Sequence, residues 1–279
     1  MSANEADMRL GFLGDVMGRA GRNAVLDNIG HLKSSLGIDF LIINVENAAG
    51  GFGITTALVN DFMDAGADCL TTGNHAFDQR DDLGVFETEP AMIRPANYPS
   101  SCPGRGAALL AGGGELQVLV VQVLGQRFMN PIDDPVSAIE RELDGLVLGQ
   151  DADAIVIDVH AEASSEKYAL GHYLDGRVTA VVGSHTHVPT ADFQVLPGGT
   201  AFHSDAGMCG DYDSVIGMEK AGPVESMVSK MRSGRMVPAS GPATICGTVI
   251  DSDPKTGLAQ AVYPLRLGGR LAETLPPRR

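Results

Sequence analysis

The sequence has no clusters of lysine and arginine, no long apolar run and no paired cysteines, and each absence excludes a class of protein. The formal net charge is −15 over 279 residues, and binding a phosphate backbone requires clustered basic side chains, so a long nucleic acid is excluded as a partner. Without a long apolar run, we expect neither a signal peptide nor a transmembrane helix. We therefore expect a cytoplasmic protein that binds no membrane.

The four cysteines are Cys69, Cys102, Cys209 and Cys246, and none belongs to a Cys-x-x-Cys pair. This scatter disfavours a structural zinc site and is typical of a protein in a reducing compartment. Internal repeats, low-complexity segments and linkers are also missing from the sequence, so nothing marks a domain boundary. We expect a single domain over residues 8–270, with loose tails at 1–7 and 271–279.

Apolar segments alternate with amphipathic helices as far as Thr72. Strands are expected at 9–13, 39–45 and 68–72, and helices at 22–36 and 57–65. Val25, Ile29 and Leu32 recur at helical spacing, so the first helix should pack on a sheet. The continuous apolar run at 40–43 is typical of a strand that is covered on both faces of a parallel sheet. This order predicts a parallel β-α-β-α-β unit.

The rest of the chain predicts a second set of strands. Buried strands are expected at 116–124, 154–159 and 178–182, and helices from Pro135 and at 162–170. Shorter alternating segments at 192–196, 200–203, 244–250 and 260–265 predict antiparallel hairpins. We therefore predict an α/β fold with two packed mixed β-sheets flanked by helices, a four-layer sandwich. The proline-broken segment 76–106, with one short helix, and the loop at 205–220 are expected to form a small cap.

Polar residues follow most of these strands at the point where each strand ends. They are Asp15, Glu46, Asn47, Asn74, His75, His160, His185 and His187. The carboxyl ends of parallel strands form one ligand-binding edge, so these side chains should meet. For each residue alone, a helix N-cap at Asp15 or an ordinary polar turn elsewhere is the simpler interpretation. Their recurrence at successive strand ends favours a shared site.

These side chains offer imidazole, carboxylate and amide groups without a thiolate. Such ligands suit Mn, Fe, Ni or Zn. Eight candidates are too many for one ion, and two ions about 3.5–4 Å apart are the arrangement that binds the attacking and leaving oxygens in phosphoryl transfer. His185 and His187 are two apart in an extended segment, so they could serve one metal each or two adjacent metals.

In this order the residues resemble the motifs of a known superfamily. Gly14-Asp15, Gly73-Asn74-His75, His160 and Gly183-Ser184-His185-Thr186-His187 are similar to the GD, GNH, H and GHxH blocks of the calcineurin-like metallophosphoesterases. Two positions depart from that pattern: Met17 stands where the DxH motif has histidine, and Glu46-Asn47 replaces the bridging aspartate of GDxxD. Both departures resemble the bacterial YmdB-like phosphodiesterase branch. Further blocks shared with that branch are Phe128-Met129-Asn130-Pro131, His160-Ala161-Glu162, Leu196-Pro197-Gly198-Gly199-Thr200 and Asp205-Ala206-Gly207-Met208.

The resemblance implies a dinuclear-metal phosphodiesterase that hydrolyses cyclic nucleotides, above all 2′,3′-cyclic nucleotides, by attack of a metal-bridging hydroxide. It also implies that Glu46 bridges the ions. Asp15, Asn47 and His187 would complete one site, and Asn74, His160 and His185 the other. The expected cofactors are two divalent or mixed-valence transition metals, iron or manganese above all.

His75 lies beside Asn74 but is assigned to no metal. We expect it to be catalytic, either by protonating the leaving alkoxide or by stabilising the transition state, and the alternative is a satisfied turn histidine. Met17 removes one imidazole, which should favour harder metals over zinc. The glycine segments 50–53 and 198–200 are more often plain turns than phosphate contacts, so no substrate-binding residue is assigned. His203 is expected to pair with Asp205.

Two other functions compete with the phosphodiesterase. One is a phosphomonoesterase or protein phosphatase that uses the same centre, and the other is a metal-bound signalling or interaction protein with little turnover. A protein phosphatase needs an open groove, whereas a small nucleotide needs a closed pocket. The expected partner is a small phosphate ester such as a cyclic nucleotide, and self-association into a homo-oligomer is left open.

Overall fold

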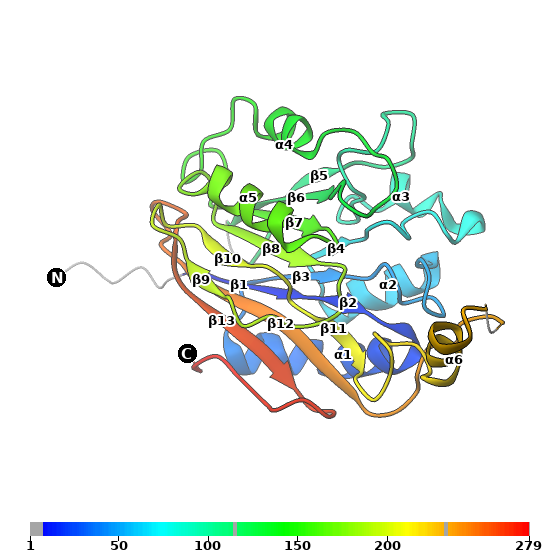
Figure 1. Ribbon diagram of the computed structural model, residues 1–279. Coiled ribbons are helices and arrows are strands. Elements are labelled where there is room, and N and C mark those ends of the chain that lie inside the picture. The colour runs from blue at the N-terminus through cyan, green and yellow to red at the C-terminus, as the bar shows by residue number, and fades with distance from the viewer. Residues whose placement is uncertain (1–7, 114–115, 232–233, 279) are drawn as a thin grey trace.

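Two mixed β-sheets lie face to face in the structure, a computed structural model that describes residues 8–113, 116–231 and 234–278 (Figure 1). The first has the order β2-β11-β12-β1-β3-β4, with β13 paired to β12, and the second the order β5-β6-β7-β8-β10-β9. The strands of the first sheet are β1 (Met8–Leu13), β2 (Asp15–Val16), β3 (Phe40–Asn44), β4 (Cys69–Thr71), β11 (Met208–Asp211), β12 (Ala243–Ser252) and β13 (Ala259–Leu267). Those of the second are β5 (Ala107–Ala111), β6 (Gln117–Leu124), β7 (Ala154–His160), β8 (Ala180–Ser184), β9 (Gln194–Val195) and β10 (Ala201–His203).

Helices cover the outer face of each sheet. The first sheet carries α1 (Gly18–Leu36) and α2 (Thr56–Ala65), and the second carries α4 (Pro135–Leu143) and α5 (Ser164–Leu174). The short helices η1 (Arg80–Asp82) and α3 (Val85–Thr88) follow β4, and α6 (Ala221–Ser229) stands at the periphery beyond β11 (Figure 1). The α/β fold with two packed sheets between helices, predicted from the sequence, is confirmed.

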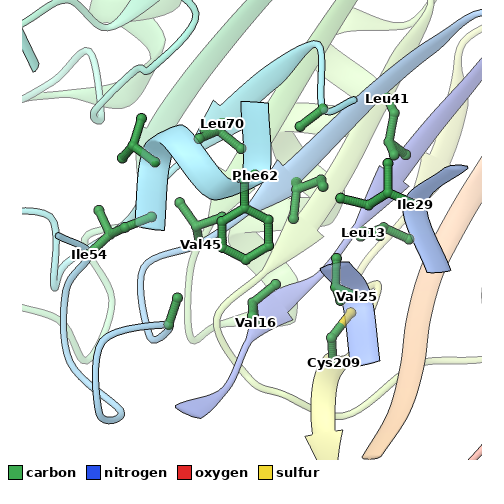
Figure 2. Packing of buried hydrophobic residues seen from close by; sticks show 14 of the residues in the cluster. Leu13, Val16, Val25, Ile29, Leu41, Val45, Ile54, Phe62, Leu70 and Cys209 are labelled. Atoms are coloured by element: carbon green, nitrogen blue, oxygen red, sulfur yellow. The ribbon is translucent and has the colours of Figure 1, made fainter. Parts of the chain in front are cut away.

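Three hydrophobic clusters hold the layers together. The cluster between the sheets includes Phe12 and Phe40 from the first sheet and Val120 and Val156 from the second. Another cluster joins α1 and α2 to the first sheet, and Figure 2 shows Phe62 of α2 at its centre. The third joins α4 and α5 to the second sheet. Each large apolar side chain that is fully buried contributes about 1.5–3 kcal/mol, so the strands are firmly fixed relative to one another.

Parallel pairing brings the carboxyl ends of the strands to one edge. In the first sheet, β1 pairs in parallel with β3, with Leu13 opposite Ile43, and β3 pairs in the same way with β4. In the second sheet, β7 pairs in parallel with β8, with His160 opposite Ser184. The polar residues that follow these strands are therefore delivered to one place.

Several element predictions differ from the structure. The first helix begins at Gly18 rather than at residue 22, because Met17 at its N-cap makes no side-chain capping bond and leaves no start signal in the sequence. Residues 201–203 form an antiparallel pair with β9 but also a parallel pair with β8, so they are not part of a hairpin alone. The sequence does not predict β5, β11 or α6. Of these, β11 has only four residues, and α6 has no buried residue to give a periodic pattern.

The end of the chain is attached to the body, in contrast to the expected loose tail. Thr274 exchanges two backbone hydrogen bonds with Arg266 (2.7 and 2.9 Å), and Arg9 Nη1 donates to the carbonyl of Pro277 (2.8 Å). The expected tail at 1–7 lies outside the described residues. Over the part of the chain that is described, no helix combines the length and the apolar character needed to cross a membrane.

Candidate metal centre

All eight residues selected from the sequence lie together at the carboxyl edge of the two sheets. The first sheet supplies Asp15 in β2, Glu46 and Asn47 after β3, and Asn74 and His75 after β4; the second supplies His160 in β7, and His185 and His187 after β8. Ligand atoms of Asp15, Glu46 and His187 lie within 4.8 Å of one another, and so do those of Glu46, His160 and His185. Glu46 therefore belongs to both groups, which is the geometry required of a bridging carboxylate.

Three acceptor or ligand atoms converge on one imidazole nitrogen. Nε2 of His160 lies 3.1 Å from Glu46 Oε1, 3.0 Å from Asn74 Oδ1 and 3.1 Å from His185 Nδ1. The other nitrogen, Nδ1, lies 2.9 Å from Ser184 Oγ, whose single hydrogen is donated to a carboxylate oxygen of Asp158. Ser184 can therefore only accept from Nδ1–H, which leaves the Nε2 lone pair free for the cluster.

The close approach of these side chains requires glycine at position 73, after β4. A Cβ atom added at Gly73 would lie 2.2 Å from Glu46 Oε2 and 2.4 Å from His160 Nε2. Only glycine lets the backbone before Asn74 approach so closely, which explains the glycine of the Gly-Asn-His block.

The backbone around the two later histidines is strained. Five non-glycine residues of the described chain have positive φ, and three of them surround this site: His185 (94°), His187 (66°) and Ile216 (45°). Each such residue costs on the order of 1–3 kcal/mol, and strain of this kind concentrates at functional sites. The strain is useful at His187, because its Nδ1–H donates to the Ile216 carbonyl (2.8 Å) and Nε2 is left for the cluster.

Two unpaired oxygens show that the residues fit a bound cation. Among the described residues, the buried side-chain atoms without a hydrogen-bond partner are Asp15 Oδ1 and Asn47 Oδ1. Asp15 uses Oδ2 to accept from the backbone N–H of His185 (3.1 Å), and Asn47 donates from Nδ2 to the Gly51 carbonyl (3.0 Å). An unsatisfied buried polar atom costs about 1–3 kcal/mol, which a cation bound to both oxygens would remove.

Burial and mutual charge perturb the pKa values of the cluster. Burial raises the pKa of the Asp15 carboxyl, although His187 opposes the shift. Burial would also raise the pKa of Glu46, but the charge and hydrogen bond of His160 lower it to about 2. Burial would lower the pKa of His160, yet Glu46 and Asp15 raise it to about 9. Burial and the nearby His160 lower the pKa of His185 to about 3. The carboxylates around His160 thus favour positive charge on its ring. At Nε2 that charge can come from a bound cation in place of a second proton.

His75 stands beside the ligand cluster and faces the cavity. Its backbone N–H donates to Glu46 Oε2 (3.0 Å), and its Nδ1–H donates to Asp78 Oδ2 (2.7 Å). Phe52 packs edge-on against its ring, with centroids 5.1 Å apart. The sequence prediction missed Asp78, although a residue three positions after His75 is a natural partner for it in a turn. Because Nδ1 is bonded to Asp78, Nε2 is the ring nitrogen available to a ligand in the cavity that His75 lines.

A cavity of about 390 Å³ opens over these residues. Its polar lining consists of Glu46, Asn47, His75, Glu162, His185, Thr186 and His187. Its apolar lining consists of Met17, Gly51, Phe52, Val215, Ile216, Met218, Pro223 and Met236. Within the described ranges, none of the lining residues is lysine or arginine. The expected cap loop at 205–220 therefore lines the site, whereas no lining residue comes from 76–106.

Met17 occupies an apolar part of the site. It is 2% exposed and packs with Met208 and Met218, and Phe52 and Tyr212 lie against this cluster. A thioether cluster here replaces the imidazole that the DxH motif would supply, and among the described residues the histidine grouped with Asp15 and Glu46 is His187.

The structure also tests the predictions for the glycine segment 198–200 and for His203. In segment 198–200, Gly198 N–H donates to Asp175 Oδ2 (2.8 Å), which makes the segment a turn outside the lining of the cavity. The prediction that His203 pairs with Asp205 is wrong. His203 Nε2–H donates to the Thr190 carbonyl (3.1 Å) and its Nδ1 bonds Thr248 Oγ1 (2.7 Å), because Asp205 is already bonded to other donors.

Comparisons with known proteins agree with this arrangement. The sequence model of a family described as YmdB-like protein matches residues 12–265. Over 252 residues the chain is 40% identical to the 2′,3′-cyclic-nucleotide 2′-phosphodiesterase of Bacillus subtilis strain 168, and the match covers 89% of this chain and 93% of that protein.

Two solved structures have the same fold. A hypothetical protein from Thermus thermophilus has a TM-score of 0.86 and 39% sequence identity, over 94% of this chain and 100% of that chain. A novel phosphatase from Mycoplasma pneumoniae has a TM-score of 0.86 and 30% identity, over 94% of each chain.

Proposed function

The chain belongs to the YmdB-like protein family, and we propose that it is a phosphodiesterase that hydrolyses 2′,3′-cyclic nucleotides at a centre of two metal ions. It is a phosphoric ester hydrolase, as its named relatives are. The observation that carries the proposal is the position of Glu46, whose carboxylate lies in both groups of ligand atoms. The unpaired oxygens of Asp15 and Asn47 support the same assignment.

In the proposed centre Glu46 bridges the ions. Asp15, Asn47 and His187 complete one site, and Asn74, His160 and His185 complete the other. Two ions bound there would supply Lewis acidity, which activates water and offsets negative charge on the phosphoryl oxygens. Iron or manganese is proposed because the ligands are oxygen and imidazole groups without a thiolate.

The residues of the chain supply positioning and proton transfer. Glu46 fixes the backbone of His75 through one hydrogen bond (3.0 Å), and Asp78 fixes its ring through another (2.7 Å). In the imidazolium form, Nδ1–H of His75 donates to Asp78 and Nε2–H is the second proton, which we propose is transferred to the leaving alkoxide, so that the ring becomes neutral. Such a transfer contributes about 10²–10⁴-fold to a rate.

The lining of the cavity favours a diester over a monoester. A phosphomonoester carries about −1.5 to −2 charges near pH 7 and a diester carries one. The lining contains the carboxylates of Glu46 and Glu162, and among the described lining residues no lysine or arginine offsets them. A monoanionic cyclic diester is therefore the better match, and a cavity of about 390 Å³ suits one nucleotide.

Kinetics with matched substrates test the proposal. Metal-loaded protein should hydrolyse 2′,3′-cyclic AMP with a higher kcat/KM than 3′,5′-cyclic AMP or p-nitrophenyl phosphate. Elemental analysis of the same preparation should give two metal equivalents per chain, and Glu46→Gln should lose both turnover and metal. Faster hydrolysis of the monoester would instead assign a phosphomonoesterase.

We also propose a cytoplasmic location, which is supported by four cysteines that are all free of disulfides. Self-association into a homo-oligomer is left open, and light scattering of the purified protein would decide it.

A further inference from the structure

We propose that the nucleobase of the substrate packs on an apolar wall of the cavity, and that the side chain of Ile216 gives the enzyme its preference for nucleotides over base-free cyclic diesters. The inference rests on the proposed function. The apolar wall consists of Phe52, Ile216, Met218, Pro223 and Met236.

Polar and apolar groups are segregated within the cavity. Most of its polar lining residues follow the carboxyl ends of parallel strands, where the metal ligands lie. The wall comes from two other segments, the loop that carries Phe52 and the chain between β11 and β12. None of the five wall side chains has a hydrogen-bond donor or a strong acceptor. A ligand held with its phosphate at the polar side therefore meets only apolar surface on the other side.

Ile216 occupies a turn position that disfavours isoleucine. Val215 and Met218 exchange two backbone hydrogen bonds (2.9 and 3.0 Å) around Ile216 and Gly217, which both have positive φ (45° and 94°). Two-residue turns of this kind favour Asn-Gly or Gly-Gly, and a β-branched residue there is a genuine outlier. Glycine is required next to it, because a Cβ at Gly217 would lie 2.4 Å from Met17 Cγ.

The side chain of Ile216 gains no compensating burial. Its carbonyl accepts from His187 Nδ1–H (2.8 Å), but any residue at this position would offer that carbonyl. The residue is 55% exposed, and it lines the cavity. A strained, exposed isoleucine at the mouth of the site is explained by contact with a ligand, since neither the turn nor the core requires it.

A purine or pyrimidine matches this wall chemically. Bases stack on apolar and aromatic side chains without requiring base-specific hydrogen bonds. Phe52 is the only six-membered aromatic ring among the described lining residues, and its edge contacts His75. A base on the wall therefore lies next to the residue proposed to protonate the leaving alkoxide.

The decisive experiment compares two substrates in three proteins. The substrates are 2′,3′-cyclic AMP and methyl riboside 2′,3′-cyclic phosphate, which has no base. The proteins are the wild type, Ile216→Gly and Val228→Ala, the last being a control on α6 that is 79% exposed and absent from the lining. The ratio of the two kcat/KM values should fall at least fivefold in Ile216→Gly and stay at the wild-type value in Val228→Ala.

Thermal unfolding separates this role from a structural one. Glycine relieves the strain of the turn, so Ile216→Gly should melt within a few degrees of the wild type. An unchanged ratio in a variant that melts normally would overturn the inference and leave the proposed function intact.

Photolabelling gives a readout that needs no turnover. In metal-loaded protein and after chelation, 8-azidoadenosine 2′,3′-cyclic phosphate should label peptides that contain Phe52, residues 215–218 or Met236. Labelling elsewhere would overturn the inference. If the wild type hydrolysed neither substrate, the proposed function would fail, and the labelled peptides would still decide whether the wall binds a base.

Discussion

His160 is oriented by a chain of hydrogen bonds that ends in a buried carboxylate. Ser184 Oγ accepts from the imidazole and donates to Asp158 Oδ1 (2.6 Å), while Asp158 Oδ2 accepts from Thr71 and Gln122 (2.7 Å each). Burial raises the pKa of Asp158 to about 6, so at neutral pH it remains mostly ionised and can accept all three bonds. Partners of this kind fix the tautomer of a metal-binding histidine and raise its basicity.

Replacing Ser184 should therefore weaken metal binding without touching a ligand. We expect Ser184→Ala to lower metal affinity by about 10–100-fold, because His160 loses the acceptor for its Nδ1–H. Isothermal titration calorimetry of the metal-depleted protein with Mn²⁺ measures this affinity. Ser34→Ala, at an exposed serine of α1, is the matched control. Equal affinity in both variants would mean that the chain of hydrogen bonds does not act on the metal.

Asp78 gives a second prediction at this scale. Its carboxylate holds the ring of His75 through a 2.7 Å bond, so Asp78→Asn should lower kcat for 2′,3′-cyclic AMP by about 10–100-fold. An activated ester such as bis(p-nitrophenyl) phosphate needs little protonation of its leaving group and should lose much less. Asp81→Asn, at an exposed aspartate nearby, should leave both rates unchanged. An equal loss on both substrates would exclude the positioning role.

The candidate ligands could be selected from the sequence, but the residues that support them could not. A candidate such as Asp15 stands just beyond an apolar strand, so its position in the fold is visible in the pattern. Ser184 and Asp158 lie inside strands that are buried throughout, so no alternation of polar and apolar residues marks them as supports of the site. The role of Ile216 depends on backbone dihedral angles, which leave no residue pattern when an unfavourable residue occupies the turn.

At the scale of elements, helix α5 supports the loop between His185 and His187 through a buried ion pair. Lys167 Nζ, on α5, donates to Asp205 Oδ2 (2.8 Å) and to the Ser184 carbonyl (2.8 Å). The same carboxylate oxygen accepts from the N–H (3.1 Å) and hydroxyl (2.7 Å) of Thr186. The side chains of Lys167 and Asp205 are each 2% exposed, so neither charge has water to replace its partner.

Removing one member of this pair should be costly. Lys167→Met leaves the charge of Asp205 buried, and we expect a loss of about 3–5 kcal/mol in the free energy of unfolding. The double variant Lys167→Met/Asp205→Asn should recover part of that loss, because no unpaired charge remains. The exposed pair of Lys220 and Asp213 is the control, and Lys220→Met should cost about 0–1 kcal/mol. Denaturant unfolding measures all four proteins, and a double variant no more stable than Lys167→Met would contradict the argument.

Long elements could be predicted from the sequence, whereas short ones depended on tertiary contacts. The strand β7 has seven consecutive buried residues, and such a run is easily recognised. The strand β11 has four residues and exists because it lies between β2 and β12. Helix α6 buries no residue, so it carries no periodic apolar signal. The lining of the cavity depends on these short elements and the loops beside them.

At the scale of the whole molecule, His203 connects the two sheets. It ends β10 of the second sheet, and its Nδ1 accepts from the hydroxyl of Thr248 on β12 of the first (2.7 Å). Nε2–H must be the donor to the Thr190 carbonyl, so in the neutral imidazole Nδ1 is the acceptor that faces Thr248. Burial lowers the pKa of His203, although the Thr190 carbonyl, Asp192 and Asp205 oppose the shift. The folded state therefore binds this proton more weakly than the unfolded chain does.

This difference predicts that the sheets separate more easily in acid. The unfolded pKa is about 6.5 and the folded pKa lies below it. Stability from His203 is therefore complete above about pH 6.5 and falls as the pH drops below that value, by at most about 1.4 kcal/mol per pH unit. Denaturant unfolding from pH 5 to 7.5 with chelator should give a steeper acid loss for the wild type than for His203→Gln. The chelator removes metal from both proteins, so the residues of the metal site contribute the same pH dependence to each stability curve. Parallel stability curves would show that protonation of His203 does not weaken the contact between the sheets.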